Sequence, residues 1–464
     1  MKKKWLALAL AAIMLVGLLA GCGGSGNNST PPADTGSDTA DTPPADTGSD
    51  TKDEEPADTG SDAAGSVYWL NFKPEADDLL QQIAGMYTEK TGVPVKVVTA
   101  ASGTYESTLV SEMDKSAPPT MFVVGNAPAV KTWGDFALDL TGTAIANELD
   151  SDAYMLYDAD GKLVSIGYSY EAIGIITNAD LLEEAGYTVE EINNFDALKA
   201  AAEDIHARAG ELGFDAFTSN DMDDSSSWRF TGHLINTALY YDEQATGKWS
   251  DTPATLTGDY VDNFRNIYDL AVENSTVTRD SLATGGHDAE AEFKEGKAVF
   301  FINGSWEYGN VIDDVPSATM IPYYCGVDGE ENAGLGCGSE NYWAINGTVS
   351  EDDQKATMDF MVWLVTDPEA SELIVNGAGG FGAMPYKSAV ASTNGFLARA
   401  SELAADGHYV MDWAFNFTPN VNDFRAGVVS ALNQYNAAPS DDTWETVRTA
   451  IVDGWATQAA LANG

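Results

Sequence analysis

The strongest constraint on the fold is an alternation of short apolar segments with amphipathic helical ones throughout residues 66–464. Val67–Leu70 is a short apolar run and Val93–Val98 is rich in β-branched residues, and between them 79–87 repeats apolar residues at helical spacing. This order predicts a βαβ unit whose two strands run parallel. The chain is therefore predicted to be an α/β protein with mostly parallel sheets that helices cover on both faces.

The alternation continues along the rest of the chain. Apolar runs predict strands at 121–124, 162–167, 173–178 and 298–302, and an alternating strand that opens at 342. Apolar residues at helical spacing predict helices at 105–115, 179–185, 195–208, 354–365 and 442–454. A chain of 464 residues is long enough for two large units.

The net charge excludes several kinds of partner. The chain carries 72 Asp and Glu against 23 Lys and Arg, a formal net charge of −49, so its field repels nucleic acid and anionic membrane surfaces. Residues 66–464 keep 62 of the acidic side chains, so the excess belongs to the folded part. A solvated acidic surface and the attraction of cationic ligands are both open as its purpose.

The N-terminus is typical of an exported lipoprotein. Lysines at 2–4 precede an uncharged run at 5–20, which is too short to span a bilayer and has the layout of a signal peptide. The sequence Leu-Ala-Gly-Cys at 19–22 resembles the bacterial lipobox, whose cysteine is acylated. We expect residues 1–21 to be removed and Cys22 to anchor the mature chain through its acyl chains, palmitate among them. An ordinary secretory cleavage site is the alternative.

Residues 22–65 are predicted to form a disordered acidic tether. After Cys22 the segment has no aromatic or large aliphatic side chain, so it cannot bury enough surface to fold. Its heptapeptide PADTGSD recurs at 32–38, 44–50 and 56–62 but has no apolar face to stack. Proline and aspartate are expected to keep the tether extended.

Two cysteines remain in the folded part. Cys325 and Cys337 form an even pair, which in an oxidising compartment suggests a disulfide across 326–336. Two reduced, buried thiols are the alternative.

Motifs for catalysis and metal binding are missing from the sequence. The four histidines are far apart, and neither HExxH, GxSxG nor GxxxxGK[ST] occurs. The cysteine pair lacks the further ligands of a zinc site, and the acidic loop at 158–162 lacks the closing glutamate of a calcium loop. The sequence predicts no catalysis, no metal and no cofactor.

A series of short motifs resembles one protein family. The motifs are Tyr87–Val93, Pro119–Val124 with Trp133 and Asp139–Thr141, Gly174–Asn178 with Leu181 and Leu182, Phe293–Phe300 with Gly304–Trp306, Tyr342–Asn346 and Phe360–Leu364. In this order, behind a lipobox, they are similar to the family 1 extracellular solute-binding lipoproteins of bacterial ABC importers, which include maltose-binding protein. The resemblance covers essentially all of 66–464.

The resemblance implies a two-lobed α/β fold of the periplasmic-binding-protein type, with a hinge and an interlobe cleft. Lobe one would comprise 66–172 and 330–377, and lobe two would comprise 173–329 and 378–464. It also implies a monomeric, lipid-anchored receptor at the extracellular face of the cell membrane. Such a receptor binds a mono- or oligosaccharide and delivers it to an ABC permease, without chemistry of its own.

The resemblance also points to residues that would hold the sugar. Sugar rings offer apolar faces to aromatic side chains and hydroxyls to polar ones. The family places a stacking tryptophan at Trp306, a carboxylate at Glu171 and a further aromatic residue at Trp228. Core packing of Trp306 and a solvated position of Glu171 are the structural alternatives.

Four more candidates follow predicted strands of lobe one. Asn71 and Lys73 come directly after the first strand, and Gly125 and Asn126 follow the strand at 121–124. A glycine at such a point lets the backbone approach a ligand closely. An ordinary turn and a surface lysine are the alternatives.

The last four candidates lie nearer the C-terminus. Tyr342 is expected to face the cleft, because neighbours in a strand point to opposite faces. Phe381, in a glycine loop, and Trp413, in an alternating aromatic stretch, resemble the second edge of the family's cleft, with core packing as the alternative for Trp413. Arg425 resembles part of the family's last ligand-contacting helix, although a phenylalanine replaces the larger aromatic residue before it.

Two other functions stay open on the sequence. One is an importer receptor for a non-sugar solute, such as a peptide or a polyamine. The other is a secreted carbohydrate-active hydrolase, because paired carboxylates cannot be recognised without their spacing in three dimensions. The lipobox, the order of the motifs and the lack of a catalytic signature favour the sugar receptor.

Overall fold

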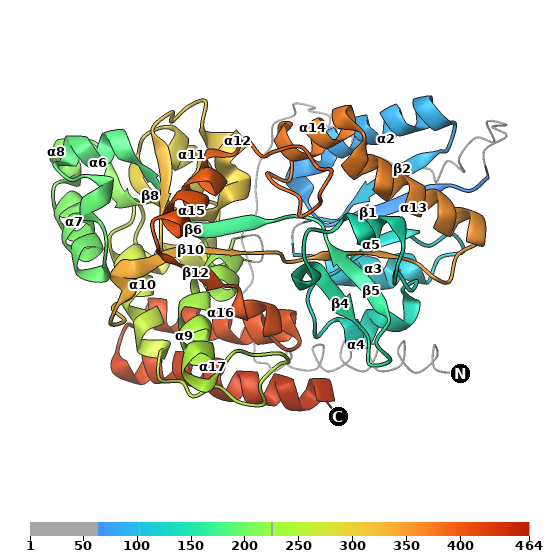
Figure 1. Cartoon of the computed structure of the whole chain (residues 1–464). Helices are drawn as coiled ribbons and strands as arrows, with labels where there is room; N and C mark the ends of the chain where they lie inside the picture. Colours follow the sequence, from blue (N-terminus) through green and yellow to red (C-terminus); the bar gives the residue numbers. More distant parts are fainter. Residues whose placement is uncertain (1–63, 102, 224–225, 464) are drawn as a thin grey trace, which may run out of the picture. The chain divides into compact units, whose positions relative to one another are not determined.

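Within the described residues, the strands form two six-stranded sheets (Figure 1). The computed structural model describes residues 64–101, 103–223 and 226–463. The predicted signal peptide, Cys22 and the tether up to residue 63 lie outside the described residues. Two sheets with helices around them confirm the predicted α/β class.

The first sheet has the strand order β2-β1-β3-β11-β5-β4. Its strands are β1 (Val67–Asn71), β2 (Val95–Thr99), β3 (Met121–Val124), β4 (Met155–Tyr157), β5 (Leu163–Gly167) and β11 (Tyr342–Ile345). The helices that belong with this sheet are α2 (Asp77–Thr91), α3 (Tyr105–Met113), α4 (Val130–Trp133), α5 (Ala144–Glu148), α13 (Glu351–Thr366) and α14 (Pro368–Asn376).

The second sheet has the order β12-β10-β6-β8-β7, with β9 paired to β6 off this path. Its strands are β6 (Glu171–Asn178), β7 (Asp215–Phe217), β8 (Ala298–Gly304), β9 (Ala318–Ile321), β10 (Ala333–Gly338) and β12 (Tyr409–Asp412). The helices that belong with the second sheet are α6 (Ala179–Ala185), α7 (Phe195–Ala207), α8 (Ala209–Leu212), α9 (Asn236–Thr246), α10 (Val261–Glu273), α11 (Ala289–Lys294), α12 (Tyr308–Val311), α15 (Gly395–Ala405), α16 (Val421–Ala437) and α17 (Asp441–Asn463).

Both sheets are mixed, so the prediction of mostly parallel sheets is wrong. β1 pairs in parallel with β2 and β3, but β11 runs antiparallel to β3 and β5. β6 likewise runs antiparallel to β8, β9 and β10. The reason is the connectivity, because β6 and β11 each enter their sheet directly from the other sheet and not through a helical crossover.

Capping signals set the ends of helix α6. The Asn178 side chain accepts a hydrogen bond from the Leu181 N–H at 3.1 Å, which satisfies a free donor of the first turn. Gly186 closes the helix with φ 98°, a left-handed conformation that glycine adopts without strain. The prediction of a helix at 179–185 is therefore confirmed.

The apolar cores of the two sheets are separate, and the second sheet has one core on each of its faces. Trp69 and Trp343, at most 1% exposed, belong to the core of the first sheet. Neighbouring residues of β6 face different cores of the second sheet, with Ile175 on one side and Ile176 on the other. The structure thus divides into two α/β lobes, as the predicted fold class requires.

The chain passes between the two sheets three times, at 168–170, 339–341 and 377–394. Figure 1 shows β6 and the segment from β10 to β11 running from one sheet towards the other. The predicted boundaries differ in two places. Residues 333–338 pair as β10 with β6 and β12, in lobe two and not in lobe one. Phe381 and Tyr386 pack into the core of lobe one and not of lobe two.

The two cysteines are free thiols, so the predicted disulfide is absent. Cys337 lies on β10 and packs in the core on one side of the second sheet, whereas Cys325 packs in the core on the other side. The sheet therefore separates the two sulfur atoms. Burial raises the pKa of both thiols, to about 11 for Cys337, which disfavours the reactive thiolate.

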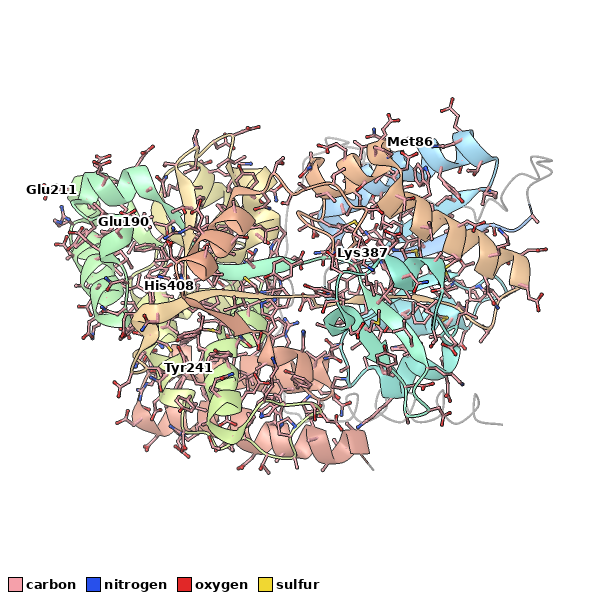
Figure 2. The ribbon with its side chains drawn as sticks, in the orientation of Figure 1. Met86, Glu190, Glu211, Tyr241, Lys387 and His408 are labelled. Atoms are coloured by element: carbon pink, nitrogen blue, oxygen red, sulfur yellow. The ribbon has the colours of Figure 1, made fainter. Side chains whose placement is uncertain are left out.

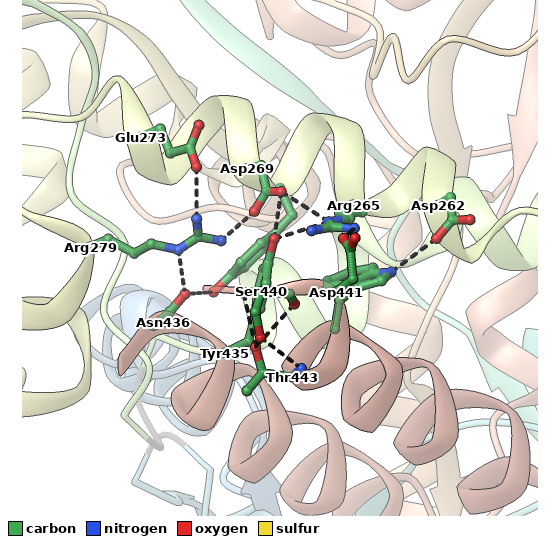
Figure 3. A network of polar contacts seen from close by, with 12 residues as sticks. Asp262, Arg265, Asp269, Glu273, Arg279, Tyr435, Asn436, Ser440, Asp441 and Thr443 are labelled. Atoms are coloured by element: carbon green, nitrogen blue, oxygen red, sulfur yellow. Dashed lines mark hydrogen bonds and ion pairs between the residues drawn. The ribbon is translucent and has the colours of Figure 1, made fainter. Parts of the chain in front are cut away.

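A polar network ties α10 to α16 (Figure 3). Arg279 forms an ion pair with Asp269 and donates to Asn436 Oδ1 at 3.1 Å. Arg265 donates to the Tyr435 hydroxyl at 3.0 Å. The Arg279 guanidinium also lies 4.4 Å from the centroid of the Tyr435 ring, a cation–π geometry.

The surface carries many exposed acidic side chains. Figure 2 shows two of them, Glu190 and Glu211, at the outer edge of lobe two, where both are exposed. Acidic groups in such positions stay hydrated and keep a protein soluble.

Candidate functional site

A cavity of about 320 Å³ lies between the two lobes. This volume is at the lower end of the range for small-molecule pockets. Its wall in lobe one comes from the segments after β1, β2 and β3, which are parallel neighbours and end at the same edge of the sheet. Its wall in lobe two comes from the segment after β8, from the π-helix at Arg229–Leu234 and from α16.

Lobe two supplies an aromatic wall. The Trp228 and Trp306 rings lie 5.7 Å apart at an interplanar angle of 57°. The His233 ring lies 5.3 Å from Trp306 and 5.2 Å from Phe415. All four line the cavity. Such a surface offers flat faces to apolar parts of a ligand.

Trp306 is held in place by its own backbone segment. A Cβ on Gly304 would lie 2.2 Å from the Trp306 ring, so only glycine leaves room for the indole to fold back over the end of β8. Ser305 fixes the same turn, because its hydroxyl accepts from the Ala172 N–H at 3.0 Å and its carbonyl accepts from Asn394 at 2.8 Å.

A buried ion pair joins the two walls. Lys73 follows β1 and its Nζ lies 2.6 Å from Glu171 Oε1, at the start of β6, and 3.7 Å from Glu75. Burial alone would lower the pKa of Lys73, but the neighbouring carboxylates, Glu171 foremost, raise it well above its ordinary value. Burial raises the pKa of Glu171, an effect that Lys73 offsets in part.

Asn71 positions Lys73 without lining the cavity. Its side-chain oxygen accepts from the Lys73 N–H at 3.0 Å, and its amide nitrogen donates to the Lys73 carbonyl at 2.6 Å. These bonds fix the turn that carries the lysine into the cleft.

Further carboxylates line the cavity. Glu340 Oε2 lies 3.8 Å from His233 Nε2. Burial acts to raise the pKa of Glu340, but His233, with Lys73 and Arg425, outweighs it and holds the pKa below its ordinary value. Glu307 accepts hydrogen bonds from two asparagines at 2.9 and 3.0 Å, and burial raises its pKa.

Seven of the eleven predicted ligand-binding residues line the cavity: Lys73, Gly125, Asn126, Glu171, Trp228, Trp306 and Arg425. The other four lie elsewhere: Asn71 beneath the Lys73 turn, Tyr342 with its hydroxyl 3.3 Å from the Ser339 carbonyl, Phe381 in the core of lobe one, and Trp413 in the core of lobe two. Tyr342, Phe381 and Trp413 are not among the residues that line the cavity, so the expectation that they face it is not borne out.

Several residues that line the cavity were not predicted from the sequence. Glu75 lies in a short 3-10 helix at Pro74–Ala76 and Glu340 in a loop, and neither differs by sequence pattern from the many other acidic residues of this chain. His233 lies in a π-helix, a rare conformation that often marks functional sites but has no sequence signal. Tyr105 opens α3 at a position that helical periodicity assigns to the core, where its ring also packs.

Two further properties bear on function. None of the described helices is long and apolar enough to span a bilayer. No three His, Cys, Asp or Glu side chains within the described part of the chain are grouped so as to hold a metal ion.

Comparison with known proteins gives a family and a fold. The profile of a family described as bacterial extracellular solute-binding protein matches residues 82–405, more than half of the chain. Solved structures with the same fold include RafE in complex with raffinose, with a TM-score of 0.64 and 17% identity over 86% of this chain and 100% of that one.

Two more solved structures share the fold. The bacterial solute receptor AcbH, described with a preference for β-D-galactopyranose, has a TM-score of 0.66 and 13% identity over 85% of this chain and 98% of its own. The maltose-bound MalE3 of T. maritima has a TM-score of 0.62 and 16% identity over 84% and 99%. At such identities the likeness establishes the two-lobed fold.

Proposed function

The chain belongs to the family of bacterial extracellular solute-binding proteins, and on that premise we propose that it captures a mono- or oligosaccharide in the interlobe cavity. The family is one of binding proteins, in agreement with the prediction that the chain is not an enzyme. The observation that carries the sugar assignment is the pairing of an aromatic wall with a polar one around a single cavity.

The two walls match the two kinds of surface on a sugar. The Trp228 and Trp306 rings are suited to stack on apolar ring faces. Glu171, at the start of β6, and Asn126, after β3, carry acceptors and donors for hydroxyls that leave water on binding. The raffinose, galactopyranose and maltose in the descriptions of the similar structures point to the same ligand class.

The rest of the proposal concerns how the protein is used. The lobes would close over the ligand by a shift of population between open and closed states. Cys22 would carry the lipid anchor at the extracellular face, and the tether would let the monomeric receptor reach an ABC permease, which would receive the sugar.

A ligand screen by thermal shift tests this function. Mono- and oligosaccharides, amino acids, peptides and polyamines are added separately to the purified full chain. A ligand that binds only the folded state raises the melting temperature by mass action, by an amount that grows with its concentration. We expect shifts with saccharides, followed by calorimetry to obtain Kd.

Trp306→Ala is the diagnostic variant. Loss of a stacking platform worth about 1–3 kcal/mol should weaken sugar binding about 5- to 150-fold. Trp249→Ala, which removes a partly buried tryptophan outside the cavity, is the matched control and should leave Kd unchanged. A peptide hit without any saccharide hit, or turnover of a glycan, would contradict the proposal.

A further inference from the structure

The side chains around the cavity carry an excess of negative charge. Five glutamates of the described residues line it: Glu75, Glu106, Glu171, Glu307 and Glu340. Lys73 and Arg425 are the fixed cations among the lining residues. One lysine therefore serves both Glu171 and Glu75, whereas Glu340 has Arg425 and Glu307 has Arg229, which lies outside the lining, as a neighbouring cation.

The excess is concentrated around Lys73. Glu171 and Glu75 lie 2.6 and 3.7 Å from its ammonium, and Glu340 is close enough to act on the pKa of the same lysine. Two carboxylates thus contact one ammonium on one side of the cavity, and Glu340, whose ion pair is with His233, adds a third negative charge nearby. Uncompensated charge in a partly buried site is costly, and a second cation from the ligand would relieve it.

A second, independent feature points to a polar ligand at the same place. His233 is 6% exposed and its ring packs against Trp306 and Phe415 in the cavity wall. Its Nδ1 is buried and has no hydrogen-bond partner among the residues described. A buried polar atom without a partner destabilises a protein, so a donor or acceptor of the ligand is the group that would satisfy it.

We propose that the ligand is a cationic saccharide, an amino sugar whose ammonium group is bound by Glu75, Glu171 and Glu340. This inference rests on the sugar-binding function proposed above. The aromatic wall holds the ring, the ammonium adds the missing positive charge beside Lys73, and His233 Nδ1 pairs with a ring substituent. A bare metal ion would not use the aromatic wall, and a linear polyamine would not need it.

Calorimetry with a matched series of ligands tests the inference. β-1,4-linked disaccharides of glucose, N-acetylglucosamine and glucosamine share one ring skeleton and differ at the 2-substituent, and the corresponding galactose and galactosamine monosaccharides extend the series. We expect the amino forms to bind the full chain at least tenfold more tightly than their neutral partners. Raising the salt concentration should reduce this preference, because ions screen charge pairs.

Two variants separate charge from packing. Glu340→Gln and Glu75→Gln keep the shape of the side chain and should lower the preference for the amino form over the neutral form to less than threefold. Glu190→Gln removes an exposed acid at the outer edge of lobe two and should alter neither value.

The outcomes distinguish the inference from the function on which it rests. Neutral saccharides that bind as tightly as the amino forms overturn the inference and leave the sugar-binding function intact. Binding of spermidine without binding of any saccharide overturns both. Amino-sugar preference that persists in both glutamine variants also contradicts the inference, because the carboxylates would then not be its source.

Discussion

Gly304 shows how a residue without a side chain can determine a binding surface. Its missing Cβ is what allows the Trp306 ring to lie over the end of β8. The backbone at Gly304 is extended, with φ −135°, a conformation that any residue adopts. The constraint is therefore steric contact with the indole and not backbone strain.

We predict that Gly304→Ala weakens ligand binding without unfolding the protein. The added methyl group displaces the indole, which is the movable partner of the clash, and should cost about tenfold or more in Kd. Calorimetry measures the loss, and intrinsic tryptophan fluorescence reports the displacement. Gly309→Ala is the control, since its Cβ would meet no atom within 4 Å. Equal Kd values for both variants would show that Trp306 is not positioned in this way.

Lys73 is predicted to matter for stability as well as for binding. Lys73→Met leaves Glu171 buried without its partner, and breaking a buried pair costs about 3–5 kcal/mol in the free energy of unfolding. Urea denaturation measures this difference. Adding Glu171→Gln to the same chain removes the orphaned charge and should recover most of the loss. A double variant no more stable than Lys73→Met would contradict the pairing.

Glu340 predicts a pH dependence with a definite sign. Its pKa in the folded state lies below the ordinary value of 4.5, so its ionised form stabilises the fold above that pH. The contribution is lost as pH falls below 4.5 and through the lowered pKa. The difference in free energy of unfolding between the native chain and Glu340→Gln should therefore shrink as the pH falls through this range. If the difference in the free energy of unfolding grows as the pH falls, the prediction is contradicted.

At the scale of elements, the network of Figure 3 predicts how α10 is held to α16. Arg279 is 10% exposed on its side chain and pairs with Asp269. Arg279→Met should lower the free energy of unfolding by about 2–3 kcal/mol, between the values for exposed and buried pairs. Lys355→Met breaks the exposed pair between Lys355 and Asp359 and should change the free energy of unfolding by less than about 0.5 kcal/mol. Similar losses in both variants would argue against the network.

The elements were predictable where local signals are strong. Asn178 and Gly186 mark both ends of α6, and the apolar run of β8 leads directly to Trp306, so this part of the site could be found from the sequence. For Trp306 one short segment holds both the structural signal and the functional residue. Glu171 could be found only through the family resemblance, because the strand expected from the sequence begins at 173 and not at 171.

The rest of the site depends on contacts that no local pattern encodes. Strand alternation separates Tyr342 from Trp343 but does not say which face meets the cleft, and both are buried. His233 reaches the cavity through a π-helix, and Glu340 lies in a crossing whose position the motifs do not determine. The sequence could not decide between a disulfide and two free thiols. Only the folded structure shows that the second sheet lies between Cys325 and Cys337.

At the scale of the whole molecule, both lobes are assembled from distant parts of the chain. We predict that a chain ending at residue 341 does not form a stable first lobe, because β3 and β5 lose β11 between them. Hydrogen exchange should show unprotected amides in both strands. Adding the missing 342–464 segment as a separate chain should restore part of the protection. Full protection in the truncated chain would contradict the prediction.

The central position of β11 also has a consequence for synthesis. The strand that completes the first sheet follows nearly all strands of the second in chain order, with β12 alone coming later. A nascent chain that leaves the ribosome N-terminus first therefore cannot close its first sheet until most of its length has been made. Such a delay keeps the polypeptide open through translation, which is the state that a protein must be in to thread through a translocation channel.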